Sequence, residues 1–158
     1  MDYKHTFKAS LTWRKTDKEI NSSKKVYEKS HTISIAGKPQ LSISAAKAFK
    51  GDPALYNPED LLLSSLMSCH MMSYLYVCAT HNIELVSYAD NAVATLETNA
   101  DGSGKIIEVQ LNPQVTLKDK NQQELALSLH QEANKLCFIA NSCNFPVKHH
   151  ATCVPAEI

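Results

Sequence analysis

Two cysteines occupy sequence settings that could support redox chemistry. Cys69 falls within residues 57–70, which combine a polar start with a strongly apolar body, and Cys137 falls within residues 133–142, at the end of a second amphipathic segment. A cysteine reacts as its thiolate, and attack on a peroxide oxygen or a disulfide is assisted by a nearby cation that lowers the thiol pKa. Two such thiols on two predicted helices form a candidate dithiol.

The other thiols and the adjacent histidine have simpler interpretations. Cys69 alone could be a small buried hydrophobe, because free cysteine is among the most buried residue types. Cys78 lies about 180° round the helix from Cys69, so it cannot share a site with it and is expected in the core. Cys143 and Cys153 lie in or beside the last predicted strand and are expected to be structural. His70 points about 100° away from its neighbour Cys69, so a packing or supporting role is expected rather than that of a base.

A metal site is an alternative use of the C-terminal cysteines. Its ligands would be Cys137, Cys143, His149 and Cys153. The spacing matches none of the common paired-ligand patterns of zinc sites, so a metal is not expected. A dithiol cycle would need no bound organic cofactor either.

Alternating apolar residues predict strands in the N-terminal third of the chain. Residues 3–13 alternate with a period of two, which is typical of a half-buried antiparallel strand. Shorter alternations over residues 31–35 and 41–45 flank a turn that contains Gly37, and they predict a hairpin.

A long helix is predicted to follow from about residue 58 to about residue 80. Asn57 can act as its N-cap, Pro58 suits the first helical position, and Glu59 and Asp60 suit the positive end of the helix dipole. Apolar residues surround the helix axis, which is the pattern of a helix enclosed on most sides. Something must therefore cover it.

The rest of the chain predicts more strands around a second helix. Strands are expected within residues 83–98 and 107–117, where Pro113 favours an edge position or a bulge, and a last strand over 145–153. Between them, Asn121 and Glu124 form a possible capping box for a helix that extends to about residue 140. Strands linked mostly by hairpins, with two helices, indicate an α+β fold, and no linker divides residues 1–158, so one domain is expected.

Composition narrows the range of partners. The chain has 158 residues, and its 16 basic and 16 acidic side chains cancel. Without a broad positive field, nucleic acid and membrane surfaces are not expected as partners. The N-terminus does not have the pattern of a secretory signal, and five cysteines are an odd number, so reduced thiols in the cytoplasm are expected rather than a disulfide framework.

The two cysteine motifs together resemble those of the OsmC/Ohr family of cysteine-based peroxide-reducing proteins. The motifs are Asn57-Pro58-Glu59 with Cys69 ten residues after the glutamate, in a Ser-Cys-His context, and Cys137-Phe138-Ile139-Ala140-Asn141-Ser142. The resemblance implies an antiparallel sheet wrapped around a long buried central helix, in an intertwined homodimer. It also implies that hydroperoxides are the substrates, that Cys69 is the peroxidatic thiol and that Cys137 is the resolving thiol. An external thiol, such as a dihydrolipoyl group, would be the reductant.

The cation that supports the thiolate in this family is an arginine held by a glutamate, and Glu59 matches that glutamate. Arg14 is the only arginine of the chain, and the Tyr-x-Arg-x-His stretch of the subgroup is replaced by one with Lys29 at the arginine position. Lys29 is therefore the matching candidate for the cation, and Arg14 is the other. An ammonium lacks the planar fork that binds a carboxylate and a thiolate together.

Spacing along the helix adds an expectation that does not depend on the family. Ten helical residues separate Glu59 from Cys69 by about 15 Å, so one basic side chain could hardly contact both within a subunit. Glu59 is therefore expected to serve the site of a partner chain. The alternative function is a non-enzymatic protein of the same fold that binds a small ligand and keeps its thiols as spectators, which the loss of the arginine favours.

Overall fold

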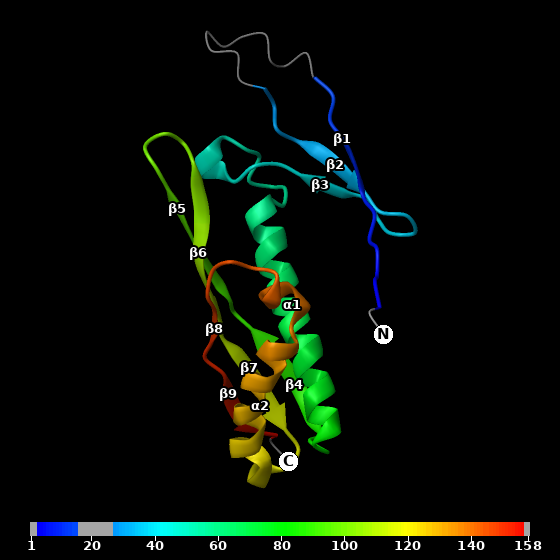
Figure 1. Ribbon diagram of the computed structural model, residues 1–158, viewed down its shortest axis with the longest axis vertical. Helices are drawn as coiled ribbons and strands as arrows, with labels where there is room; N and C mark the ends of the chain where they lie inside the picture. Colours follow the sequence, from blue (N-terminus) through cyan, green and yellow to red (C-terminus); the bar gives the residue numbers. More distant parts are fainter. Residues whose placement is uncertain (1–2, 16–26, 157–158) are drawn as a thin grey trace. The chain divides into compact units, whose positions relative to one another are not determined.

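The protein folds into two compact units, Met1–Leu61 and Leu62–Ile158, of which the computed structural model describes residues 3–15 and 27–156 (Figure 1). Strands and helices are mixed in the order expected from the sequence, so the α+β class is confirmed. Whether the two units form one domain stays a prediction.

The first unit contains a small antiparallel sheet in the order β1-β2-β3. Its strands are β1 (Ser10–Thr12), β2 (His31–Ser34) and β3 (Leu41–Ile43). Gly37 has a φ of 76° in the turn between β2 and β3, a conformation that favours glycine, so the predicted hairpin is confirmed.

The long strand predicted over residues 3–13 is wrong in extent. Only Ser10–Thr12 pairs with β2, residues 3–9 are in no strand, and Phe7 is 92% exposed. Period-two alternation shows that a segment could form a strand, but a strand exists only where another strand supplies its hydrogen bonds. Within the described part of this chain, residues 3–9 find no such partner.

Helix α1 (Pro58–Thr80) has the boundaries that the sequence predicts. Its start is fixed by reciprocal hydrogen bonds, because the Asp60 amide donates to Asn57 Oδ1 at 2.9 Å and the Asn57 amide donates to Asp60 Oδ2 at 3.2 Å. Its end has a left-handed residue, Asn82 with a φ of 55°, after which the Ile83 amide donates to the Cys78 carbonyl at 2.9 Å. Such a left-handed cap ends many helices.

Burial along α1 is uneven. Five side chains are buried, namely Leu66, His70, Tyr74, Val77 and Cys78, whereas Met72 is 57% and Tyr76 64% exposed. By length and composition alone α1 could cross a membrane, a test that core helices of soluble proteins also pass. Because Met72 and Tyr76 are exposed, the expected cover on most sides of this helix stays a prediction.

Two three-stranded sheets form the scaffold of the second unit (Figure 1). One has the order β4-β7-β9, from β4 (Leu85–Asp90), β7 (Pro113–Leu117) and β9 (Thr152–Pro155), and the other has the order β5-β6-β8, from β5 (Val93–Thr98), β6 (Gly104–Leu111) and β8 (Val147–His149). Strands β8 and β9 run parallel to β6 and β7, so the pairing is mixed rather than wholly antiparallel.

Pro113 occupies a different place from the one predicted. It is the first residue of β7, which is the central strand of its sheet, and its Cα lies opposite Asp90. Proline has no backbone N–H to donate to a neighbouring strand. It is tolerated at the first position of a strand, where that hydrogen bond is not needed. The prediction of an edge or a bulge was wrong because sequence alone does not order the strands.

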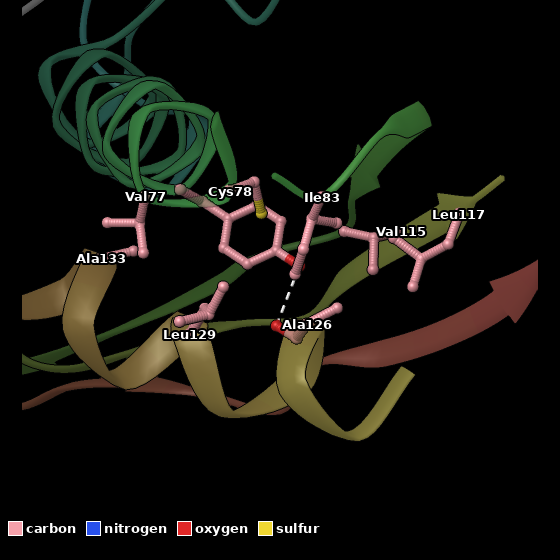
Figure 2. Packing of buried hydrophobic residues seen from close by; sticks show 9 residues of the cluster. Val77, Cys78, Ile83, Val115, Leu117, Ala126, Leu129 and Ala133 are labelled. Carbon is pink, nitrogen blue, oxygen red and sulfur yellow. Dashed lines mark hydrogen bonds between the residues drawn. The ribbon is translucent and has the colours of Figure 1, made fainter. Parts of the chain in front are cut away.

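Helix α2 (Gln123–Leu136) packs with α1 against one face of β7. Figure 2 shows this cluster, in which Val77 and Cys78 of α1 meet Val115 and Leu117 of β7 and Ala126, Leu129 and Ala133 of α2. A second cluster packs Leu66 of α1 against Val109 and Leu111 of β6. The two clusters thus hold α1 by apolar contact on β7 of one sheet and on β6 of the other.

The predicted single helix over residues 121–140 is divided in two. The cap is Asp119, which accepts a hydrogen bond from the Asn121 amide at 2.9 Å before a short 3-10 turn (Lys120–Gln122), so the proposed Asn121 and Glu124 capping box is wrong. After α2 the backbone extends at Cys137, with φ −74° and ψ 105°, and α3 (Phe138–Asn141) follows. The break turns the chain at the motif cysteine.

Candidate functional site

The structure brings Cys69 and Cys137 together within the second unit. Cys69 lies midway along α1, Cys137 lies between α2 and α3, and both are free thiols. The two thiols lie close enough that the Cys69 thiol contributes to raising the pKa of Cys137. Residues 68 positions apart in the sequence thus form one dithiol.

Cys137 is the inner member of this pair. It is 0% exposed, whereas Cys69 is half-buried. The pKa of the Cys137 thiol is raised to about 11, mainly by burial; the Ala140 amide, which donates to its Sγ at 3.4 Å, lowers the pKa, and the Cys69 thiol raises it. Cys137 is therefore a protonated thiol at neutral pH, and Cys69 is the thiol that a solute reaches first.

The two candidate ionic residues lie in the first unit. The Lys29 ammonium donates to the Phe49 carbonyl, and the carboxylate oxygen Oε2 of Glu59 is buried without a hydrogen-bond partner. Lys29 and Glu59 do not pair with each other, since the ion pairs among the described residues are Lys118 with Glu84 and Lys148 with Glu108. A buried carboxylate oxygen without a donor is costly, and none of the described residues supplies that donor to Glu59 Oε2.

Arg14 has no carboxylate partner among the described residues either. It lines a cavity of about 380 Å³ in the first unit with Leu55 and several hydroxyl-bearing side chains. Among the described residues of this unit, no hydrogen bond or ion pair joins its guanidinium to Glu59.

A buried pair of histidines lies between α1 and α2, and the sequence analysis identified only one of them. His70 Nε2 and His130 Nδ1 are 3.0 Å apart, and both residues are fully buried. His130 also stacks on Tyr74, with ring centroids 3.8 Å apart, and His149 of β8 lies against His70 at 5.6 Å. The expectation that His70 packs rather than acts on Cys69 agrees with this arrangement.

Burial keeps these histidines neutral. It lowers the pKa of His70 to about 4, with a further decrease from His149, and lowers the pKa of His130 to about 3, with further decreases from His70 and His149. Burial also lowers the pKa of His149. One signal for His130 was available in the sequence, because it shares the helical spacing of the apolar residues Ala126 and Ala133 on α2.

The remaining cysteines do not join the dithiol. Cys78 is buried in the core as predicted, and burial raises the pKa of Cys78, Cys143 and Cys153. Within residues 3–15 and 27–156, no three His, Cys, Asp or Glu side chains converge to hold a metal ion, so the alternative zinc site is not assembled there.

Chemically, the site offers one accessible thiol backed by one buried, protonated thiol. Such a pair can lose two electrons by forming a disulfide. The buried thiol supplies a proton when it reacts.

Sequence and structure comparisons agree on the family. Residues 51–151 match the family described as OsmC-like protein. An OsmC-like protein of unknown function from Vibrio cholerae is 30% identical, with a TM-score of 0.83 over 94% of this chain and 100% of that chain. No functionally curated protein matches the sequence.

More distant structures share the fold. An organic hydroperoxide resistance protein from Elizabethkingia anophelis has a TM-score of 0.70 at 15% identity, over 99% of this chain and 100% of that one. The organic hydroperoxide resistance protein OhrB of Bacillus subtilis has a TM-score of 0.62 at 22% identity, over 94% and 98%. With the match over residues 51–151 and the Vibrio cholerae relative, these comparisons show that the chain belongs to the OsmC-like family.

Proposed function

We propose that the protein reduces hydroperoxides through a dithiol and disulfide cycle of Cys69 and Cys137. The observation that carries this proposal is the proximity of the two thiols, one half-buried on α1 and one fully buried at the α2–α3 break. The names of the hydroperoxide resistance proteins that share the fold support the choice of substrate.

Atoms and electrons balance in this cycle when one hydroperoxide is the oxidant and two external thiols are the reductant. The Cys69 sulfur attacks the terminal peroxide oxygen, the O–O bond breaks, and the thiol proton goes to the leaving alkoxide, giving an alcohol and a sulfenic acid. The Cys137 sulfur then forms the S–S bond as the S–O bond of the sulfenic acid breaks, and the Cys137 proton leaves with the hydroxyl as water. Two external thiols, such as those of a dihydrolipoyl group, reduce the disulfide and become oxidised to a disulfide themselves.

Burial fits the order of these steps. Cys69 is half-buried and the more accessible of the two, so it meets the peroxide, and the fully buried Cys137 is protected from the same oxidant until its partner has reacted. The pKa of about 11 keeps Cys137 protonated and therefore able to provide the proton of the second step.

We also propose a homodimer in which Glu59 and Lys29 of one subunit complete the dithiol site of the other. Among the described residues, Glu59 Oε2 is buried without a donor, and the Lys29 ammonium donates to the Phe49 carbonyl and is in no ion pair. The exposed apolar side chains of α1, including Met72, Leu75 and Tyr76, offer a surface that a second copy would cover. Burying such side chains is worth roughly 25 cal/mol per Å² of apolar area.

The experiment is a titration of reduced protein with one equivalent of hydroperoxide, followed by intact mass measurement. The expected product is two hydrogens lighter, Cys137→Ser stops one oxygen heavier at the sulfenic acid, and Cys69→Ser consumes no peroxide. Cys143→Ser is the matched control, since Cys143 is half-buried and lies outside the pair. Unchanged peroxide consumption by Cys69→Ser contradicts the proposal.

A second candidate function is the binding of a small ligand with the thiols as spectators. A cavity of about 340 Å³ lies between α1 and β4, and it is lined by Ser64, Met67, Ser68, Met71, Tyr88, Ala89 and Asp90. A ligand in this cavity would be retained by Cys69→Ser, whereas the peroxide cycle would be lost, so the same variant separates the two functions.

A further inference from the structure

Two side-chain hydrogen bonds cross from α1 to α2 in the described part of the chain. One joins His70 Nε2 and His130 Nδ1 at 3.0 Å, and the other runs from the Tyr74 hydroxyl to the Ala126 carbonyl at 2.9 Å, the dashed line in Figure 2. The apolar contacts around them hold the helices together. These two directional contacts add a preference for one shift of α1 along α2, because each is made only where its two polar atoms meet.

Each helix also carries one thiol of the pair. His70 is the residue after Cys69, and His130 precedes Cys137 by seven residues, which is two helical turns or about 10 Å. Because a helix is stiff over such a distance, the His70–His130 contact sets the position of Cys137 opposite Cys69.

We propose that His70 and His130 are positioning residues that hold Cys137 against Cys69 for disulfide closure. The inference rests on the proposed dithiol cycle and assigns that cycle two residues which do not touch the sulfurs. In the closure step the Cys137 sulfur displaces hydroxide from the Cys69 sulfenic acid, the new S–S bond replaces the S–O bond, and the Cys137 proton completes the water. The histidines neither gain nor lose a proton.

The polar character of the pair supports a directional role. His70 Nδ1 and His130 Nε2 are both buried and have no hydrogen-bond partner, so each ring leaves one polar atom unsatisfied. Two apolar side chains would fill the same space without that cost, but they would not favour one helix register.

The surroundings keep the contact intact at neutral pH. The rings that lie against the pair are those of Tyr74 on α1, Tyr88 on β4 and His149 on β8. Burial and neighbouring histidines lower the pKa of both rings. With both rings neutral, one facing nitrogen donates and the other accepts. The hydrogen bond is lost only when both rings are protonated.

The test compares two amide side chains at position 130, each of which imitates a different nitrogen of the histidine ring. His130→Asn places its amide where Nδ1 now lies and keeps a partner for His70, whereas His130→Gln places it near Nε2 and loses that partner. Both variants lose the ring that stacks on Tyr74. The readout is the effective concentration of the Cys69 thiol that the Cys137 thiol experiences. It is calculated from the fraction of protein that carries the Cys69–Cys137 disulfide at equilibrium in buffers of reduced and oxidised glutathione. His81→Asn, at the exposed end of α1, is the control.

We expect His130→Asn and His81→Asn to keep the effective concentration within about twofold, and His130→Gln to lower it about tenfold, since small misplacements of reacting groups have effects of this size or larger. Equal values for His130→Asn and His130→Gln would overturn the inference. The glutathione measurement needs no peroxide, so a protein that closes the disulfide but fails to consume hydroperoxide refutes the proposed function and leaves this inference standing.

Discussion

The buried histidine pair makes the stability of the fold sensitive to acid between pH 7 and pH 5. The pKa values of His70 and His130 in the folded protein are about 4 and about 3, below the ordinary value of 6.5. As the pH falls below 6.5 the unfolded chain takes up protons on both rings, while the folded chain does not until its own lower pKa is reached. The free energy of unfolding therefore decreases through this window and levels off below the folded pKa values.

The size of the effect follows from proton linkage. Between pH 7 and pH 5, a histidine with an unfolded pKa of 6.5 and a folded pKa of about 4 or below reduces the free energy of unfolding by about 2 kcal/mol. His70 and His130 together give about 4 kcal/mol, a large part of the roughly 5–15 kcal/mol that stabilises a typical domain. His149 acts in the same direction because burial lowers its pKa too. Burial raises the pKa of Asp90, which opposes the trend because the folded state then holds the extra proton.

Urea denaturation at pH 7, 6 and 5, followed by far-UV circular dichroism, measures this dependence. His130→Phe keeps a ring against Tyr74 and removes one of the two titrating groups, so the loss between pH 7 and pH 5 should shrink to about half. His81→Phe removes an exposed histidine and should leave the dependence unchanged. A free energy of unfolding that is constant from pH 7 to pH 5, or an equal slope in wild type and His130→Phe, refutes the reasoning.

Three further substitutions test the packing that supports the site. Gly51→Ala should destabilise the first unit by about 3 kcal/mol, because a Cβ there would lie 1.7 Å from the Ala45 carbonyl oxygen; an unchanged thermal midpoint contradicts this close approach. Tyr74→Phe should reduce the free energy of unfolding by about 1 kcal/mol through loss of the bond to Ala126, and a neutral result in urea would mean that this bond contributes nothing. Leu66→Ala, at a fully buried position, should cost about 2–5 kcal/mol in the same assay, and a cost below 1 kcal/mol would contradict the packing of α1 on β6.

Local signals in the sequence predicted some elements with residue accuracy. Helix α1 begins at Pro58 because Asn57 and Asp60 exchange side-chain hydrogen bonds with each other's amides, a pattern complete within four residues. The β2–β3 hairpin follows in the same way from Gly37, which adopts a positive φ at the turn. In both cases every participating group is close in the sequence, so no distant part of the chain can change the outcome.

Predictions failed where a distant neighbour decides. Residues 3–9 alternate as a strand should but form no strand in the described chain, and Pro113 begins a central strand although a proline suggests an edge. A single helix was predicted to continue through Cys137, but α2 ends at Leu136. At Cys137 the chain turns into α3, and the Cys137 sulfur accepts a hydrogen bond from the Ala140 amide. None of these features has a local signature strong enough to compete with tertiary contacts.

The sequence by itself determined the α+β class, the limits of α1 and the two cysteine motifs that point to a redox site, because each depends on residue type and short-range spacing. Only the tertiary structure decided that Cys69 meets Cys137 and that Cys137 is the buried member with a raised pKa. It also revealed the contact of His70 with His130, sixty residues away. The physical reason is that burial and pairing across α1 and α2 arise when both helices pack on one sheet. Residues far apart in the sequence then lie close in space, and their order along the chain does not show this.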